Sequence, residues 1–249
     1  MKQVWLAVRS ALLWVASGIH FAVVGFVLVF FGLAIDRRKF DWLNRGFFRN
    51  ILRVAGVKFE VHHSRGFDRH RTSIFICNHV NIFDPFVIYS AIPQFVRGFE
   101  LESHFKVPLY GWMMGWFGNI PVPDKPSRQG FEIMTERAKD ALNSGISLIA
   151  FAEGSRTRSG HVQEFRKGIF NLAQKIGVPI VPMSIVGSYE FFRTGHWMLH
   201  PGKITVYLHD TIETSQVPRS EVDALRKRVQ EIVAEPVDKS LQKHKKGHS

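Results

Sequence analysis

Hydrophobic positions divide the chain into a long uncharged N-terminal stretch and a region where short apolar runs alternate with amphipathic segments. Strand-like runs lie at 57–61, 73–77, 95–101, 146–151, 180–186 and 203–208, and helical stripes at 85–91, 127–143 and 166–176. A last helical stripe follows Pro218. Alternation of strands and helices is typical of α/β domains. We therefore predict one α/β domain over residues 57–238, with a mixed, largely parallel sheet flanked by helices.

The N-terminal stretch predicts a membrane-anchoring helical segment. Residues 10–35 contain no charged side chain, and one helix of that length would measure about 39 Å against a hydrocarbon core of roughly 30 Å. The segment either crosses the bilayer once or forms a hairpin within it. A cleaved signal peptide would have a shorter apolar run, and a buried soluble helix is the remaining alternative. For a single span, the basic flank at 36–39 predicts that the following chain is cytoplasmic.

Three further segments allow more than one interpretation. Residues 40–56 form an amphipathic helix that lies at the membrane interface or covers the core, and we assign residues 1–56 to the anchor and an interfacial helix. Residues 104–123 combine large aromatics with Gly and Pro, as either buried core or a surface that meets lipid or an acyl chain. Residues 239–249 are basic without an apolar pattern, and we predict a disordered tail.

Composition narrows the class of partner. The 33 Lys and Arg against 21 Asp and Glu give a net charge of +12, which favours nucleic acid, anionic lipid or phosphorylated substrates. No zinc-finger or ribonucleoprotein signature is present, so we expect no nucleic-acid partner. No spacing indicates a metal site, and we expect neither a metal nor another cofactor. The single cysteine, Cys77, excludes an intrachain disulfide and is expected to be buried.

The most informative polar motif follows the apolar run at 73–77. His79 stands at the carboxyl end of that expected strand. Asp84-Pro85 has the form of a helix start, with Asp84 as N-cap and Pro85 at the first helical position. A His paired with a carboxylate can act as a general base, because the carboxylate fixes the tautomer and stabilises the imidazolium. The alternative is a loop His beside a capping Asp.

A second polar loop, residues 153–158, follows the apolar strand at 146–151. Gly154 permits close backbone approach, Arg156 and Arg158 can hold a phosphate, and Glu153 can accept hydrogen bonds from hydroxyl groups. A solvated turn would have a similar composition. Ligands of open α/β sheets bind beyond the carboxyl ends of strands. A base, a phosphate clamp, an apolar wall and a membrane anchor together suit transfer of a fatty chain from a thioester onto the hydroxyl of a phosphorylated lipid.

Four blocks give the chain its resemblance to the bacterial 1-acylglycerol-3-phosphate acyltransferases of the glycerolipid acyltransferase superfamily. They are Asn78-His79-x4-Asp84; Phe105 to Gly111 with Gly118 to Val122; Phe151 to Arg158 with Phe165 to Gly168; and Val178-Pro179-Ile180-Val181-Pro182. Order and spacing agree from about residue 57 to 190. Ala152 stands where the family usually has Pro. Lys125 stands one residue beyond a usual phosphate-binding Arg, and it keeps the charge without the planar fork.

The resemblance implies a membrane-bound O-acyltransferase that converts lysophosphatidic acid to phosphatidic acid in phospholipid biosynthesis. It implies that His79 is the base and Asp84 its partner, and that Glu153, Gly154, Arg156 and Lys125 bind the acceptor phosphate. The acyl donor, acyl-CoA or acyl-carrier protein, would lie on the side of Pro182. The expected location is the cytoplasmic face of the bacterial cytoplasmic membrane, with membrane lipid as partner.

Two alternatives remain at this stage, and the oligomeric state is not predicted. The same chemistry could act on glycerol-3-phosphate, another lysophospholipid or a lyso-aminolipid, as the Lys125 departure suggests. The non-enzymatic alternative is a membrane-anchored polyanion-binding module, which the net charge of +12 would suit.

Overall fold

A seven-stranded sheet organises the part of the chain that the computed structural model describes, residues 2–32, 38–39, 41–108, 110–125 and 127–246. The strands are β1 (Val57–His63), β2 (Ile74–Cys77), β3 (Val96–Leu101), β4 (Ile120–Val122), β5 (Ser147–Phe151), β6 (Ile180–Val186) and β7 (Gly202–Leu208). Their order across the sheet is β1-β7-β6-β2-β5-β3-β4. The β6–β7 pair is antiparallel and the other neighbouring pairs are parallel. The prediction of a mixed, largely parallel sheet is confirmed.

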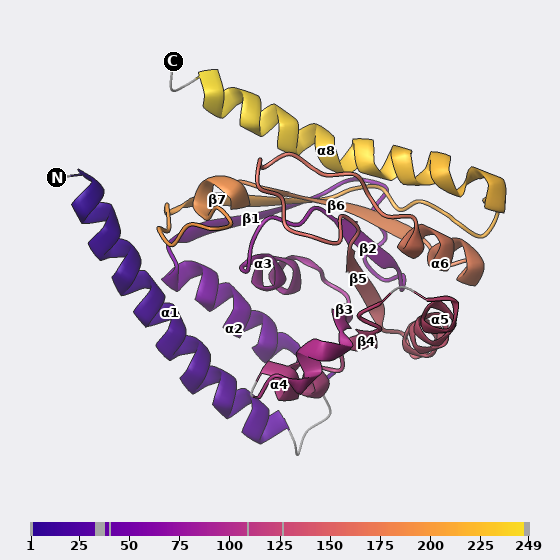
Figure 1. Cartoon of the computed structure of the whole chain (residues 1–249), viewed down its shortest axis with the longest axis horizontal. Coiled ribbons are helices and arrows are strands. Elements are labelled where there is room, and N and C mark those ends of the chain that lie inside the picture. The colour runs from indigo at the N-terminus through magenta and orange to yellow at the C-terminus, as the bar shows by residue number, and fades with distance from the viewer. Residues whose placement is uncertain (1, 33–37, 40, 109, 126, 247–249) are drawn as a thin grey trace.

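Helices cover both faces of this sheet (Figure 1). One face carries α2 (Asp41–Val54), α3 (Asp84–Ala91), α4 (Tyr110–Phe117) and α7 (Ser188–Phe191), and the other carries α5 (Arg128–Asn143), α6 (Gly168–Ile176) and α8 (Val222–Lys246). Short 3-10 turns, Glu102–Lys106 and Arg219–Glu221, complete the described elements. The helices therefore form a three-layer domain with the sheet in the middle.

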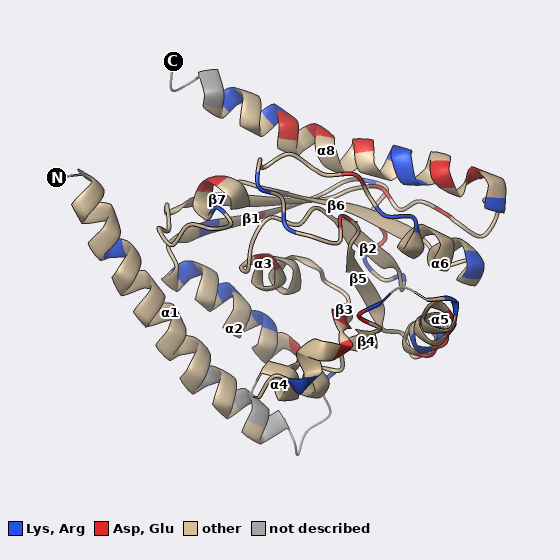
Figure 2. Cartoon of the chain, viewed as in Figure 1, with Lys and Arg blue, Asp and Glu red and all other residues tan. Residues whose placement is uncertain are grey.

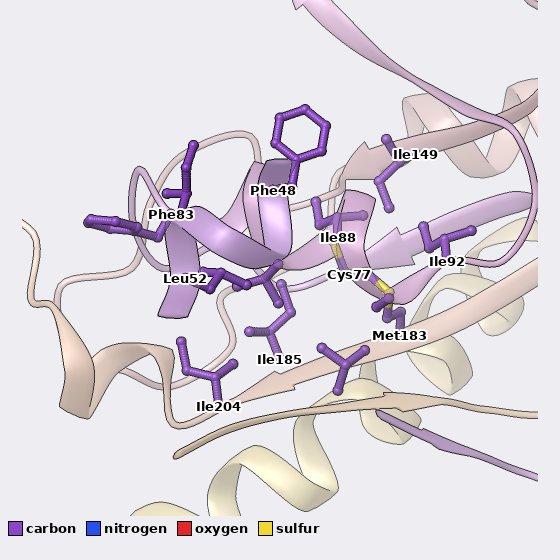
Figure 3. Packing of buried hydrophobic residues seen from close by; sticks show 14 of the residues in the cluster. Phe48, Leu52, Cys77, Phe83, Ile88, Ile92, Ile149, Met183, Ile185 and Ile204 are labelled. Carbon is purple, nitrogen blue, oxygen red and sulfur yellow. The ribbon is translucent and has the colours of Figure 1, made fainter. Parts of the chain in front are cut away.

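Strand alternation supplies both cores. Along β2, Phe75 and Cys77 point into the cluster under α2 and α3, whereas Ile74 and Ile76 point into the cluster under α6 and α8. All four side chains are buried. Figure 3 shows the first cluster, with Cys77 between the helices and the sheet. A wholly apolar strand is expected at the centre of a sheet covered on both faces, and it fixes the position of the loop that follows Cys77.

The N-terminal segment forms one continuous helix, α1 (Lys2–Gly32), so the described part of residues 10–35 contains no hairpin. Its stretch Gln3–Val27 is long and apolar enough to cross a membrane by length and composition alone, and Figure 2 shows α1 almost without charged residues, in contrast to α8. One face of α1 packs on the domain through Trp14 and Phe21. The opposite face exposes a stripe of large hydrophobic residues: Val4, Val8, Leu12, Val15, Ile19, Val23 and Phe26.

One face of helix α2 covers the core, as one of the two interpretations of residues 40–56 expected, and a position at the membrane interface stays a prediction. Phe47, Phe48, Ile51 and Leu52 are buried against the sheet and α3. Their spacing is that of one helical face, and this explains the amphipathic pattern without a membrane. The division of the chain at residue 57 stays a prediction.

The C-terminal segment differs from expectation. Residues 239–246 continue α8 as helix, so the prediction of a disordered tail is wrong for them. Val233, Val237 and Leu241 are buried and recur at intervals of four residues, which places them on the helix face that meets the domain. The many basic residues conceal this sparse stripe in the sequence. Residues 247–249 lie outside the described part of the chain.

Candidate active site

His79 and Asp84 form a close pair at the carboxyl end of β2. His79 Nδ1 lies 2.8 Å from Asp84 Oδ2. The His79 side chain is 16% exposed and its ring stacks on Phe151, with 3.8 Å between ring centroids. A neutral imidazole that donates its Nδ1 hydrogen to the carboxylate leaves Nε2 as a proton acceptor. The pair therefore has the geometry of an oriented general base.

The Asp84 carboxylate does not cap α3 as expected from the sequence. Asp84 is the first helical residue, and the preceding N-cap position, Phe83, makes no side-chain cap. Asp84 Oδ2 instead accepts hydrogen bonds from the backbone N–H groups of Val80 (2.5 Å) and Asn81 (2.9 Å). Ser188 Oγ donates to Oδ1 at 2.8 Å. The fully buried carboxylate thus holds the backbone of the loop that follows β2 as well as the imidazole.

Glu153 lies behind His79 and joins the two polar loops. Its Oε1 accepts a hydrogen bond from the backbone N–H of His79 (2.8 Å), and its Oε2 accepts one from Gln163 (2.9 Å). Burial raises the pKa of Glu153, and these two backbone hydrogen bonds oppose the shift. Both oxygens are occupied, and a carboxylate repels phosphate. These contacts indicate that Glu153 positions the loop of His79, and the expected phosphate-binding role stays a prediction.

A polar cavity of about 710 Å³ opens beside His79. Residues 154–159 form much of its lining, and Gln163 and Thr194 complete it with His79. Gly154 has φ +71°, and a Cβ there would meet the guanidinium of Arg166 at 2.5 Å, so the tight turn requires glycine. Arg156 and Arg158 are exposed in this lining. The cavity can therefore receive an anionic group within reach of His79.

An apolar cavity of about 440 Å³ lies on the other side of the His79–Phe151 stack. Its lining is mainly aromatic and aliphatic: Phe48, Phe86, Ile88, Met114, Phe117, Ile149 and Phe151 among others. Arg156 lines both this cavity and the polar one. Residues 104–123 supply part of the wall, while Trp112 from the same stretch is 71% exposed. The stretch therefore contains both buried and exposed residues, and its contact with lipid or an acyl chain stays a prediction.

Two further predicted site residues lie elsewhere. Lys125 stands exposed in the connection between β4 and α5 and lines neither cavity, as far as the described residues go. Pro182 is buried in β6 and shares a sheet face with Ser184, whose Oγ donates to Val233 of α8. That face is opposite the apolar cavity. Neither position supports the expected contact with substrate.

Several supporting residues escaped the sequence analysis. Asn78 exchanges two hydrogen bonds with the backbone of Ile185, and the Asn81 amide donates to the backbone carbonyls of Ser188 and Phe192. Both asparagines stand in the motif that precedes Asp84, so their polarity directly after a strand was a usable signal. Ser188 carried no such signal, because it is brought to Asp84 from a distant part of the chain.

Cys77 lies close to His79 in the sequence, but its thiol is unreactive. The thiol is fully buried in the hydrophobic cluster, and burial raises its pKa well above the ordinary value. A thiol held protonated is a poor nucleophile. Within the described residues, no group of three or more His, Cys, Asp and Glu side chains could hold a metal ion. The arrangement best supports direct proton abstraction by His79.

Comparison with known proteins agrees with this geometry. The model of the family described as Acyltransferase matches residues 58–186. A chloroplastic 1-acyl-sn-glycerol-3-phosphate acyltransferase of Arabidopsis thaliana is 28% identical over 167 residues, which are 67% of this chain and 45% of that protein. The enzyme of the same name from Haemophilus influenzae is 23% identical over 193 residues, covering 74% of this chain and 80% of that protein. The chain spans about half the length of the plant relatives it matches.

The fold is also found in a solved structure. The crystal structure of the 1-acyl-sn-glycerophosphate acyltransferase of Thermotoga maritima superposes with a TM-score of 0.79 at 23% sequence identity. The match covers 96% of this chain and 97% of that one. The whole described architecture, with its N-terminal helix, is therefore shared.

Proposed function

Because the chain belongs to the acyltransferase family, we propose that it transfers a fatty acyl group from a thioester donor to the free hydroxyl of lysophosphatidic acid, giving phosphatidic acid. The observation that carries this proposal is the 2.8 Å pair of His79 and Asp84 at the junction of a polar and an apolar cavity. The relatives named for this reaction support the choice of acceptor.

The reaction follows from the placement of His79. Its Nε2 takes the proton of the acceptor hydroxyl as the oxygen attacks the thioester carbonyl. The resulting tetrahedral intermediate collapses to an ester and a thiolate, which takes the proton back from the imidazolium. Asp84 stabilises that imidazolium and holds the ring. No acyl-enzyme is required, because a thiolate is a good leaving group.

The two cavities separate the substrate parts by polarity. The apolar cavity receives the acyl chain of the donor. Each buried methylene group contributes about 0.8 kcal/mol to the free energy of binding. Arg156, at the junction, holds the acceptor phosphate together with the turn at Gly154. Glu153 positions His79 through its backbone. Lys125 and Pro182 have no role in this mechanism.

The proposed location is a membrane surface, with the catalytic domain on the cytoplasmic side. The N-terminal half of helix α1 is hydrogen-bonded to the domain: Ser10 Oγ accepts a hydrogen bond from the backbone N–H of Leu199 (3.0 Å), and Trp14 Nε1 donates to the Trp197 carbonyl (2.7 Å). A helix fixed in this way presents its exposed apolar stripe to lipid while lying along the surface. This arrangement would let both lipid substrates enter from the bilayer.

The test is acyl transfer by detergent-purified protein, with lysophosphatidic acid as acceptor and a C16 acyl-CoA as donor. Phosphatidic acid should form with the wild type and not with His79→Ala. This variant should fold, because the backbone hydrogen bonds of His79 to Glu153 and Thr157 remain. Full activity in a folded His79→Ala would refute the mechanism. Preference for glycerol-3-phosphate or a lyso-aminolipid in competition would refute the proposed acceptor.

A further inference from the structure

A third cavity, of about 770 Å³, lies between α7, the loop at 193–200 and the C-terminal half of α8. Figure 1 shows these segments at the same end of the sheet. Its walls carry the imidazoles of His161, His196, His200 and His244 together with Arg193. Neither the proposed chemistry at His79 nor the acyl-chain cavity uses any of these residues.

The chemical groups of this cavity suit a nucleotide. The Arg193 guanidinium lies 5.1 Å from the ring centroid of Tyr189, which orients it from an aromatic surface. Guanidinium and imidazole N–H groups bind phosphates, and imidazole rings can stack on bases. Glu190 also lines the cavity, and its carboxylate can accept hydrogen bonds from ribose hydroxyl or base amino groups. A phosphate group alone has no ribose hydroxyl or base amino group that could donate to this carboxylate.

The cavity adjoins the polar cavity of the active site. Ser159 lines both cavities. Arg193 lines the third cavity, and its neighbour Thr194 lines the polar one. Thr194 Oγ1 donates to the Val80 carbonyl at 2.8 Å, one residue from His79. A ligand that occupies the third cavity can therefore extend past Thr194 towards the catalytic imidazole.

We propose that this third cavity binds the phosphorylated nucleotide portion of coenzyme A in the acyl-CoA donor. The inference rests on the proposed acyl transfer and names the donor for it. The acyl chain occupies the apolar cavity, the thioester carbonyl lies beside His79, and the pantetheine arm crosses the polar cavity to the nucleotide. The binding groups line a hollow, which suits a small molecule better than the surface of an acidic carrier protein.

The experiment compares Arg193→Gln with Arg128→Gln as a matched control. Arg193 is exposed, so its loss should leave the fold intact. Arg128 is an exposed arginine on α5, away from all three cavities. Adenosine 3′,5′-bisphosphate, which carries the nucleotide phosphates without a thioester, is titrated into each purified full-length protein by calorimetry. The KM values for palmitoyl-CoA, S-palmitoylpantetheine and lysophosphatidic acid are measured in parallel.

Loss of a charge-assisted hydrogen bond to phosphate should raise the Kd for the bisphosphate and the KM for palmitoyl-CoA about ten-fold in Arg193→Gln. Arg128→Gln should match the wild type, and the KM for S-palmitoylpantetheine should change far less, because that donor lacks the nucleotide. Equal bisphosphate binding by both variants would overturn the site, as would transfer from acyl-carrier protein with none from acyl-CoA. Bisphosphate binding without acyl transfer from any donor would support the site and refute the proposed function.

Discussion

Replacement of Asp84 by Asn tests the base most directly, because it removes the charge and keeps the shape. The amide oxygen of Asn can take the place of Oδ2 and accept from Val80, Asn81 and the imidazole. The amide nitrogen can donate to Ser188 Oγ, since a hydroxyl accepts as well as donates. The variant should therefore fold, with a Tm close to that of the wild type.

The catalytic loss can be worked from the contacts. The variant loses one charge-assisted hydrogen bond to the imidazolium that forms during attack, worth about 1.5–3 kcal/mol. Because about 1.4 kcal/mol corresponds to a factor of ten in rate, kcat should fall about 10- to 150-fold. Asp84→Ala is a poor test, since three buried donors would lose their acceptor at about 1–3 kcal/mol each. That sum approaches the whole stability of a domain, about 5–15 kcal/mol.

The assay is initial-rate formation of phosphatidic acid at saturating substrates, with Tm measured on the same preparations. Asp140→Asn on the exposed side of α5 is the control for an equal change of charge. It should leave kcat unchanged. A folded Asp84→Asn with more than half of the wild-type kcat would refute the reasoning, because the carboxylate would then contribute nothing to the base.

Two other predictions concern the acyl cavity and the pH dependence of stability. Gly98 of β3 lines the apolar cavity. Gly98→Val should lower kcat/KM for a C16 donor about ten-fold relative to a C12 donor, by excluding about two methylene groups. Gly98→Ala, whose Cβ would meet its nearest neighbour at an ordinary 3.5 Å, should do less, and an unchanged C16 to C12 ratio in both variants would contradict the assignment. Hydrogen bonds from Lys167 and Arg226 lower the pKa of Asp223 from 3.8 to about 2, so its stabilisation is present above pH 4 and is lost as the pH falls through 2. Asp223→Asn should therefore lower Tm slightly at pH 7, and thermal melts should show the difference shrink as the pH is lowered from 4 to 2; a difference of unchanged size at pH 2 would contradict the linkage.

The fold was largely predictable from the sequence, because burial leaves a periodic trace. The six expected strands all occur, and β4, with three residues, was missed because it is too short to show a period. The tail was missed for a related reason. Val237 and Leu241 are isolated apolar positions among charged residues, and only packing against the domain identifies them as a stripe.

The sequence predicted which loops form the candidate site, but it predicted less well what each residue in those loops does. Residue type placed His79, Asp84, Glu153 and Arg156 near one another, and the structure brings them together at the ends of β2 and β5. Residue type alone could not indicate where a carboxylate points. The sequence indicated Glu153 as a ligand-binding residue, but its carboxylate oxygens accept hydrogen bonds from two backbone N–H groups. Lys125 has the positive charge that a phosphate-binding residue needs, but the connection between β4 and α5 places it outside the lining of both cavities.

No local sequence pattern indicated that α1 contacts the loop that carries His79. Trp14 of α1 packs against Phe83, directly before Asp84, and against Phe192. The Phe192 carbonyl in turn accepts a hydrogen bond from Asn81, and the nearby Thr194 donates to Val80. The loop at 192–200 therefore contacts α1 on one side and the His79 loop on the other. A helix that served only to tether the domain would need no such contacts, so we infer that α1 also supports the loop that carries His79 and Asp84.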